Sequence, residues 1–360
     1  MKKAYLALAD GTVFEGKSLG AQGTVFGEIV FTTGMTGYTE VLTDPAFSGQ
    51  LVTMTYPLIG NSGVNHEDYQ SEHATVSGVI MKECAKHPNN FRMEESLESF
   101  LEREHVVAIT GIDTRALTKI IRTSGSMNAV LTTEEPFSFE AYSAKLASYV
   151  APPQLEAVSC KEAYTVGEGE KHVAVLDFGL RRDILASLLA KGVRATVYPA
   201  ATKAEAILAD KPDGIMLVGG PGNPADYASY LPEIKALMES EKPFFAIDLG
   251  HQLAALAMGG KTEKLKFGHR GANQPVKDLA ADRTFVTCQN HGYAVIGDSL
   301  DPAVATVTHI NLNDQTVEGI RYVKLPAVSI QFHPDSKPGS KTDAYVFDEF
   351  INMMGGKDNA

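Results

Sequence analysis

The chain has 360 residues, a hydrophobic fraction of 44% and a formal net charge of −12. Its length suggests about two domains with substantial cores, its charge argues against a nucleic-acid surface, and no stretch approaches the roughly 18 unbroken apolar residues of a membrane span. Its three cysteines, Cys84, Cys160 and Cys288, are too few and too scattered for a disulfide framework or a zinc site, which favours a reducing cytoplasm.

The first half of the chain alternates short apolar runs with turn residues. Residues 4–20 (AYLALADGTVFEGKSLG) predict two strands joined at Asp10 and Gly11, a pair typical of hairpin turns. The basic N-terminus precedes too short an apolar run for a signal peptide, so we interpret it as the first strand. With the strands and turns that follow, this pattern predicts a mixed α+β domain over residues 1–150.

Residues 106–125 (VVAITGIDTRALTKIIRTSG) predict a strand, a turn and a short amphipathic helix. Asp113 or Thr114 would cap the start of this helix, and Gly125 would end it. Residues 151–171 then lose periodicity and contain a proline pair and a Gly-Glu-Gly-Glu run, which indicates a linker.

Residues 172–360 alternate apolar strands with helical segments. The first expected strands are HVAVLDFG, RATVYPA, GIMLVGG and PFFAID, and a helical pattern follows each of them. Buried strands spaced by helices predict a parallel sheet covered on both faces. Later segments are shorter, and we expect them to add antiparallel strands to one edge. The predicted fold class is α/β, with the mixed α+β domain followed by a domain with a mainly parallel central sheet.

Sites in open α/β sheets form beyond the carboxyl ends of the strands, where this chain carries unusual residues. The turn at 218–224 (VGGPGNP) either binds an anion through its backbone N–H groups or is simply a tight turn. Asp248, in AIDLGHQ, is either the exposed side chain of a nucleophile elbow or a helix N-cap. His333 and Asp335 end a later strand, and an imidazole beside a carboxylate is the base-and-orienter part of a hydrolytic triad.

These motifs follow the order found in class I glutamine amidotransferases. That family has a glycine turn, G-x-C-x-G-H-Q at the elbow and H-P-E near the C-terminus, and this chain has GGPGNP, AIDLGHQ and FHPD. The first half, with GEIVFTTGMTGYTEVLTDPAFSGQLVTMTYPLIGN and GIDTRALTKIIRTSG, resembles the small subunit of carbamoyl phosphate synthetase. LDFGLRRDIL and KFGHRGANQPV are similar to the same family, so the resemblance covers essentially the whole chain.

The resemblance implies a site in which a cysteine thiolate attacks the side-chain amide of glutamine. By position, Asp248 occupies the place of that cysteine, His333 is the base and Asp335 is the carboxylate that orients it. The backbone N–H groups of Gly220 and Leu249 would form the oxyanion hole. Glutamine contacts would fall at Gly222, Gln252, Asn290, Gly292, Tyr293 and Ala46, the last of which is Ser in the family.

The resemblance also implies a partner, the large subunit of carbamoyl phosphate synthetase. In the family that subunit receives ammonia through a channel and uses ATP, Mg and bicarbonate. We therefore expect no cofactor and no metal in this chain, L-glutamine as the ligand if the pocket still binds it, and no nucleic-acid or membrane partner.

Asp248 is the main departure from the family. Attack by a carboxylate on an amide would have to expel ammonia to give an anhydride, but the carboxylate leaves from the adduct more readily than ammonia does. The charge of Asp248 would also favour the imidazolium form of His333. We therefore expect glutamine hydrolysis to be impaired or lost. The other departures are Ala246 for Gly, Asp335 for Glu, Ala46 for Ser, and Arg181 and Asp183 for Lys and Asn.

Three functions remain open. The chain is a synthetase small subunit with very slow hydrolysis, or it is a non-catalytic scaffold of an ammonia-dependent synthetase. In the third function, Asp248 attacks carbon electrophiles, as an elbow aspartate does in unrelated α/β-hydrolases. The N-terminal domain disfavours this function. Cys288 lies two residues before Asn290, and we interpret it as a small buried apolar residue and not as a substitute nucleophile.

Overall fold

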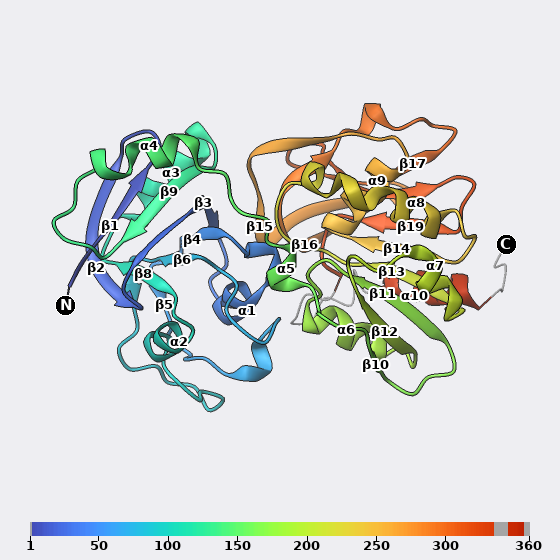
Figure 1. Ribbon diagram of the computed structural model, residues 1–360, viewed down its shortest axis with the longest axis horizontal. Coiled ribbons are helices and arrows are strands. Elements are labelled where there is room, and N and C mark those ends of the chain that lie inside the picture. The colour runs from blue at the N-terminus through green and yellow to red at the C-terminus, as the bar shows by residue number, and fades with distance from the viewer. Residues whose placement is uncertain (1, 335–344, 356–360) are drawn as a thin grey trace. The chain divides into compact units, whose positions relative to one another are not determined.

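The computed structural model describes residues 2–334 and 345–355. The chain divides into two compact units, Met1–Gln154 and Leu155–Ala360, which Figure 1 draws from blue to red along the chain. Among the described helices, none combines the length and the apolar character needed to cross a membrane.

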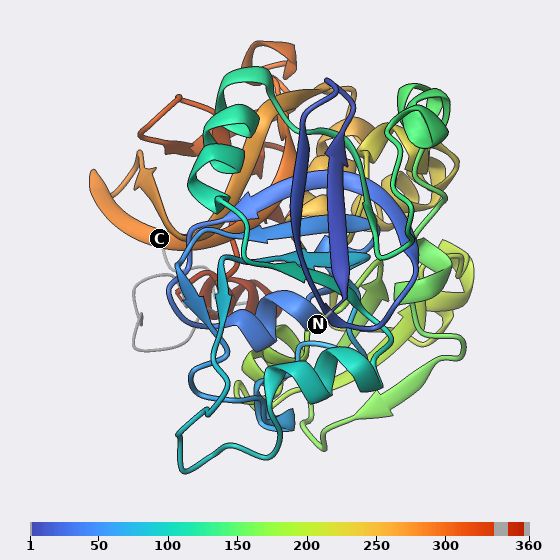
Figure 2. The same cartoon turned by 90° about the vertical axis from the view of Figure 1, so that its left-hand side faces the viewer.

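The first unit is a closed barrel with strand order β1-β2-β8-β6-β4-β3-β9. Figure 2 turns this unit toward the viewer and shows its blue and teal strands. The pairs β3/β4, β4/β6 and β6/β8 are parallel, and the remaining pairs are antiparallel. The barrel strands are β1 (Lys3–Leu8), β2 (Val13–Gly20), β3 (Thr24–Thr32), β4 (Gln50–Met54), β6 (Gly78–Ile80), β8 (Val107–Thr110) and β9 (Met127–Thr132).

The local predictions for this unit are confirmed. β1 and β2 pair antiparallel around a turn in which Gly11 has a φ of 92°, a conformation that suits glycine. The predicted helix is α3 (Thr114–Ser124), and Gly125 follows its last residue. Asp113 caps it, since its carboxylate accepts a hydrogen bond from the N–H of Ala116 at 2.9 Å.

Short helices and one small sheet cover the barrel. Apolar side chains of α1 and α2 form one core with Val30, Val52 and Val79 of the barrel strands, while Leu146 of α4 packs against Ala7 and Val130. These elements are α1 (Tyr38–Thr43), η1 (Pro45–Phe47), β5 (Leu58–Ile59), η2 (His66–Asp68), β7 (Glu83–Cys84), α2 (Leu97–Arg103) and α4 (Glu140–Ser148).

The second unit is built on a ten-stranded sheet with the order β10-β12-β11-β13-β14-β19-β18-β17-β15-β16. The five strands from β12 to β19 in this order are parallel, as predicted, and the segments after them form an antiparallel edge. The strands are β10 (Tyr164–Val166), β11 (His172–Asp177), β12 (Arg194–Pro199), β13 (Gly214–Leu217), β14 (Phe244–Ile247), β15 (Thr262–Asp278), β16 (Arg283–Val295), β17 (Ala305–Asn311), β18 (Val317–Tyr322) and β19 (Ala327–Ile330).

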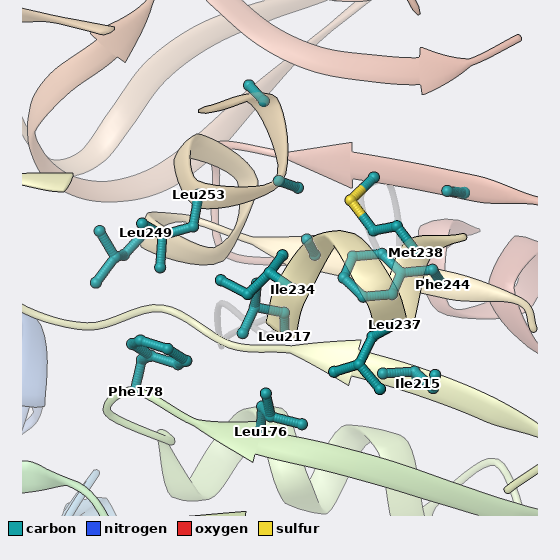
Figure 3. Packing of buried hydrophobic residues seen from close by; sticks show 14 of the residues in the cluster. Leu176, Phe178, Ile215, Leu217, Ile234, Leu237, Met238, Phe244, Leu249 and Leu253 are labelled. Carbon is teal, nitrogen blue, oxygen red and sulfur yellow. The ribbon is translucent and has the colours of Figure 1, made fainter. Parts of the chain in front are cut away.

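Helices cover both faces of this sheet. Alternate residues of β11 belong to different cores, because successive side chains of a strand point to opposite faces. One core takes apolar residues from α7, α8 and α9, and Figure 3 shows Ile234 and Leu237 of α8 gathered near Leu217 of β13. The other core takes residues from α6 and α10. The helices are α6 (Arg182–Leu189), α7 (Ala204–Ala209), η3 (Pro224–Tyr230), α8 (Leu231–Met238), α9 (Leu249–Ala257), η4 (Gly297–Ser299) and α10 (Tyr345–Met354).

The segment 151–171, for which the sequence predicts a linker, has regular structure. It contains α5 (Leu155–Val158) and the strand β10, which pairs antiparallel with β12. Only three residues of β10 pair, and two of them are exposed, so the segment lacks the alternation that would identify a strand in the sequence.

Candidate functional site

Asp248 lies at a sharp turn between β14 and α9. Its φ of 55° and ψ of −118° are values that residues other than glycine seldom adopt, so the turn is strained. Its N–H donates to the carbonyl of Ile330 at 2.9 Å, which continues the pairing of β14 with β19 beyond the strand end. The side chain makes no capping hydrogen bond to α9. Asp248 therefore has the backbone of a nucleophile elbow, and its carboxylate does not act as a helix cap.

Two glycines allow the chain to approach this turn closely. A Cβ atom on Gly219 would lie 2.6 Å from Oδ2 of Asp248, and one on Gly220 would lie 2.1 Å from the carbonyl oxygen of Phe178. Both distances are too short for any side chain. The sequence analysis did not single out Gly219, since the carboxylate that restricts it comes from a different strand.

The carboxylate of Asp248 faces the imidazole of His333. Oδ2 and Nε2 are 3.9 Å apart, and the two residues are only 2% and 1% exposed. Nε2 of Gln331 donates to the other oxygen, Oδ1, at 3.0 Å. Burial and the charge of Arg181 lower the pKa of His333, but Asp248 and the side chain of Cys288 raise it, to about 10. The imidazole is therefore positively charged at neutral pH, as the sequence analysis expected.

His333 is fixed through its main chain as well. Its N–H donates to the carbonyl of Cys288 at 2.9 Å. Its Nδ1 has no hydrogen-bond partner among residues 2–334 and 345–355. Asp335, the carboxylate expected to orient this imidazole, lies outside the described residues.

Gln252 ties the first turn of α9 to two strands. Its Nε2 donates to the carbonyl of Tyr293 on β16 and to Oε1 of Gln331, both at 2.9 Å. Asn290, on the same strand, is 6% exposed, and neither polar atom of its carboxamide has a partner in the described part of the chain. An unsatisfied buried carboxamide costs about 1–3 kcal/mol, so Asn290 is suited to a polar ligand. Gly292 lies between Asn290 and Tyr293 in the sequence and is partly exposed.

The glycine turn after β13 is held by an aromatic side chain. The hydroxyl of Tyr227 donates to the carbonyl of Pro221 at 2.6 Å, and Gly222 has a φ of 93°, which a side chain would strain. Gly220 lies against Leu249, whose side chain would be 3.2 Å from a Cβ on that glycine. Leu249 is buried in the core drawn in Figure 3.

Ala46 belongs to the N-terminal unit. It lies in η1, is buried, and its N–H donates to Oδ1 of Asp44 at 2.9 Å. Its place among the glutamine contacts stays a prediction.

A buried chain of polar side chains was missed by the sequence analysis. Nε2 of His269 lies 2.8 Å from Oδ2 of Asp314, and its Nδ1 lies 3.5 Å from Oε1 of Glu318. Nε2 of Gln289 donates to the other oxygen of Glu318 at 2.9 Å, while its Oε1 is 2.8 Å from Nε2 of His291. Polar residues occupy alternate positions of β16, and this was the one indication in the sequence. Their partners come from other strands, so the sequence did not show the contacts.

This chain of contacts continues to the elbow. Nδ1 of His291 lies 2.7 Å from the carbonyl of Tyr293, which also accepts the hydrogen bond from Gln252. Gln252 contacts Gln331, and Gln331 donates to Asp248. The polar contacts between Asp314 and Asp248 are therefore continuous, and they fix the strand that carries Asn290.

The charges of this network depend on burial and on pairing. Burial lowers the pKa of His269, but hydrogen bonds and charges from Asp314 and Glu318 raise it, to about 9. Burial raises the pKa of Glu318 and lowers that of His291 well below its usual value. Ligand atoms of His269, His291 and Glu318 lie within 4.8 Å of one another, as in some metal sites. Protein groups already bond to each of these side chains, so hydrogen bonding accounts for the cluster.

Comparisons with known proteins cover both units. Residues 6–131 match the family model for the carbamoyl-phosphate synthase small chain, CPSase domain, and residues 174–353 match that for glutamine amidotransferase class-I. The chain is 47% identical to the carbamoyl phosphate synthase small chain of Clostridium perfringens, over 97% of this chain and 99% of that protein. It is 46% identical to the small chain of Syntrophotalea carbinolica, over 98% of each.

A solved structure of a putative GMP synthase protein from Thermoplasma acidophilum has a TM-score of 0.46 and 21% identity, and covers 52% of this chain and 96% of its own. The two family models and the near full-length relatives are sufficient for an assignment. The chain belongs to the carbamoyl phosphate synthase small chain family, and its second half is a class I glutamine amidotransferase domain.

Proposed function

We propose that this chain is a small subunit that works with a carbamoyl phosphate synthase large subunit in the cytoplasm, and that its own hydrolysis of glutamine is severely impaired. The observation that carries the proposal is the elbow residue, Asp248, whose carboxylate faces a positively charged His333 at 3.9 Å. In this proposal the carboxylate stands where the family has its nucleophilic cysteine.

The chemistry of a carboxylate supports the loss. A thiolate adds to the amide carbonyl to give a tetrahedral adduct, ammonia leaves after protonation of the nitrogen, and a thioester remains. A carboxylate has a reference pKa of about 3.9 against about 8.5 for a thiol, so it is a weaker nucleophile and a better leaving group. The adduct formed at Asp248 would expel the carboxylate again and return glutamine.

Electrostatics oppose the reaction further. The imidazole of His333 holds its proton up to a pKa of about 10, so it is a poor base at neutral pH. The negative charge of Asp248 would compete with a developing oxyanion for the N–H groups of Gly220 and Leu249. Asp335, the proposed orienting carboxylate, would also stabilise the imidazolium, so it would not make His333 a better base.

The rest of the pocket supports retained binding of a carboxamide ligand. The buried carboxamide of Asn290 has no partner among the described residues and matches the two polar atoms of a glutamine side chain. Gln252 is fixed by two hydrogen bonds beside it. We propose that the contacts to glutamine within the second unit come from Gly222, Gln252, Asn290, Gly292 and Tyr293.

The direct test compares the native chain with Asp248→Cys and Asp248→Ala, each assembled with a large subunit. Glutamate release from glutamine should rise by about 100-fold or more in Asp248→Cys and stay at the native level in Asp248→Ala. Ammonia-supported synthesis of carbamoyl phosphate checks that every complex is assembled. Glutamine turnover by the native chain equal to that of Asp248→Cys would overturn the proposal.

A non-catalytic scaffold is the second candidate. It is favoured by the hydrogen bond from Gln331 to Asp248, which satisfies the carboxylate within the protein. A scaffold should raise the ammonia-supported rate or the stability of the large subunit without binding glutamine. Calorimetry with glutamine separates this candidate from a subunit that keeps its pocket.

A further inference from the structure

Cys288 lies directly opposite His333 in the second unit. The two residues form an isolated antiparallel bridge, and the N–H of His333 donates to the carbonyl of Cys288 at 2.9 Å. Residues opposite each other in an antiparallel pair project their side chains to the same face. The thiol therefore lies on the side of the backbone where the imidazole lies, and its presence there helps to raise the pKa of His333.

The imidazole of His333 thus has two acidic neighbours, Asp248 and Cys288. The imidazole is positively charged at neutral pH, so a cation lies beside both groups. A thiolate is far more nucleophilic than a carboxylate, so of these two groups the sulfur is the better suited to covalent chemistry.

A second observation points to a ligand at the same place. Asn290 is two residues beyond Cys288 on β16, and alternate residues of a strand share a face. The side chains of Thr287, Gln289 and His291 confirm the alternation, since they hydrogen-bond in sequence on the opposite face. Asn290 is 6% exposed, and neither atom of its carboxamide has a hydrogen-bond partner in the described residues. An unsatisfied carboxamide therefore lies on the same face of β16 as the thiol.

The other two cysteines provide an internal comparison. All three are half-buried, so exposure alone does not distinguish them. Burial raises the pKa of Cys84 to about 11, with help from the charge of Glu98. Burial and Asp177 raise the pKa of Cys160 to about 12. Both neighbours are carboxylates, whereas Cys288 has a cationic imidazole beside it.

We propose that Cys288 is a nucleophilic thiol beside His333 and that it forms a covalent bond with small electrophiles that carry a carboxamide. With iodoacetamide the Cys288 sulfur forms a bond to the methylene carbon, the carbon–iodine bond breaks, and iodide leaves with the bonding electron pair. The thiol proton is released to solvent. The preference for a carboxamide rests on the proposed function, while the reactivity of the thiol does not.

The test measures alkylation of the full native chain by limiting iodoacetamide at pH 7, with peptide mass spectrometry at all three cysteines. Cys288 should react about tenfold faster than Cys84 and Cys160, and His333→Asn should remove this advantage without changing the other two rates. The native protein alone also decides the question if the variant fails to fold. A rate at Cys288 no higher than at both other cysteines overturns the proposal.

Glutamine added as a protectant separates this inference from the proposed function. Fast alkylation of Cys288 that glutamine slows supports both. Fast alkylation that glutamine does not slow supports the reactive thiol and counts against a retained glutamine pocket. Slow alkylation overturns the reactive thiol, even where calorimetry shows that glutamine binds.

Discussion

His333 and Asp248 form a buried pair of opposite charges whose nearest atoms are 3.9 Å apart. The two residues come from neighbouring parallel strands, β19 and β14, at the edge where both strands end. The pair explains how a carboxylate is accommodated at an elbow that is otherwise buried, because an isolated charge there would be expensive. It also determines the protonation state on which any chemistry at this site depends.

Asp248→Asn should lower the pKa of His333 from about 10 to below its usual value of 6.5, because burial and Arg181 then act with less opposition. NMR titration of the imidazole measures this directly. Since the folded pKa is raised, the pair stabilises the fold fully below pH 6.5 and loses this contribution as the pH rises through about 10. A His333 pKa that is the same in both proteins would contradict the pairing.

Gly219→Ala should destabilise the second unit by about 1–3 kcal/mol, because its Cβ would lie 2.6 Å from Oδ2 of Asp248. The loss of stability caused by Gly219→Ala should be smaller when Asp248 is also changed to alanine, because Oδ2, the atom nearest to the new Cβ, is then absent. Urea unfolding of the two single variants and the double variant gives the coupling. Gly292→Ala is the control, because its Cβ would meet Nη2 of Arg270 at 3.3 Å and no other atom within 4 Å. Strictly additive effects of the two changes would show that the contact does not matter.

Asp314→Asn should lower the pKa of His269, which stands at about 9 in the native protein. The ion pair stabilises the fold fully below pH 6.5, where His269 is charged in both states, and the contribution disappears as the pH rises through 9. The Asp314 side chain is 41% exposed, so we expect a loss of about 1 kcal/mol near pH 5.5 and a much smaller loss near pH 9.5.

Urea unfolding at both pH values tests the pair at His269. Asp282→Asn is a matched control, since Asp282 pairs at 2.6 Å with Lys277 and not with an imidazole. If the free energy of unfolding differs between Asp314→Asn and the native chain by the same amount at both pH values, the assignment of the ion pair to His269 is wrong.

His251 should contribute to acid unfolding. It is fully buried, its Nδ1 lies 2.8 Å from Oγ of Ser329, and burial together with the charge of His309 lowers its pKa to about 3. Because the folded pKa is lowered, this contribution is complete above pH 6.5 and is lost as the pH falls toward 3. His251→Asn should therefore flatten the decline in stability between pH 6.5 and 4.5. Ser329→Ala keeps the imidazole, so it should lower stability by about 1–3 kcal/mol and leave the steep decline unchanged.

Local patterns in the sequence predicted the elements that depend on neighbouring residues. The hairpin at Gly11, the cap at Asp113 and the strand–turn–helix around Asp248 each follow from a few consecutive side chains. The parallel sheet followed as well, because buried strands and helices alternate. The roles of His333 and Asp335 stay predictions, and Asp335 lies beyond the described residues.

Features that depend on strand pairing were not predictable. Closure of the N-terminal barrel requires β1 to pair with β9, more than a hundred positions away. The requirement for glycine at 219 arises from a carboxylate on another strand. The network of His269, Gln289 and Glu318 exists only after β15, β16 and β18 have found their registers.

The neighbouring strands β14 and β19 are separated in the chain by α9 and by all of the antiparallel edge. Gln331 and Asp248 touch although they are 83 positions apart. The two sides of the candidate site therefore meet only after a long excursion has closed, which is entropically costly and slow. A chain that stops before residue 327 lacks β19, Gln331 and His333, so it contains both strands of the elbow turn's β13 and β14 pair but not the site.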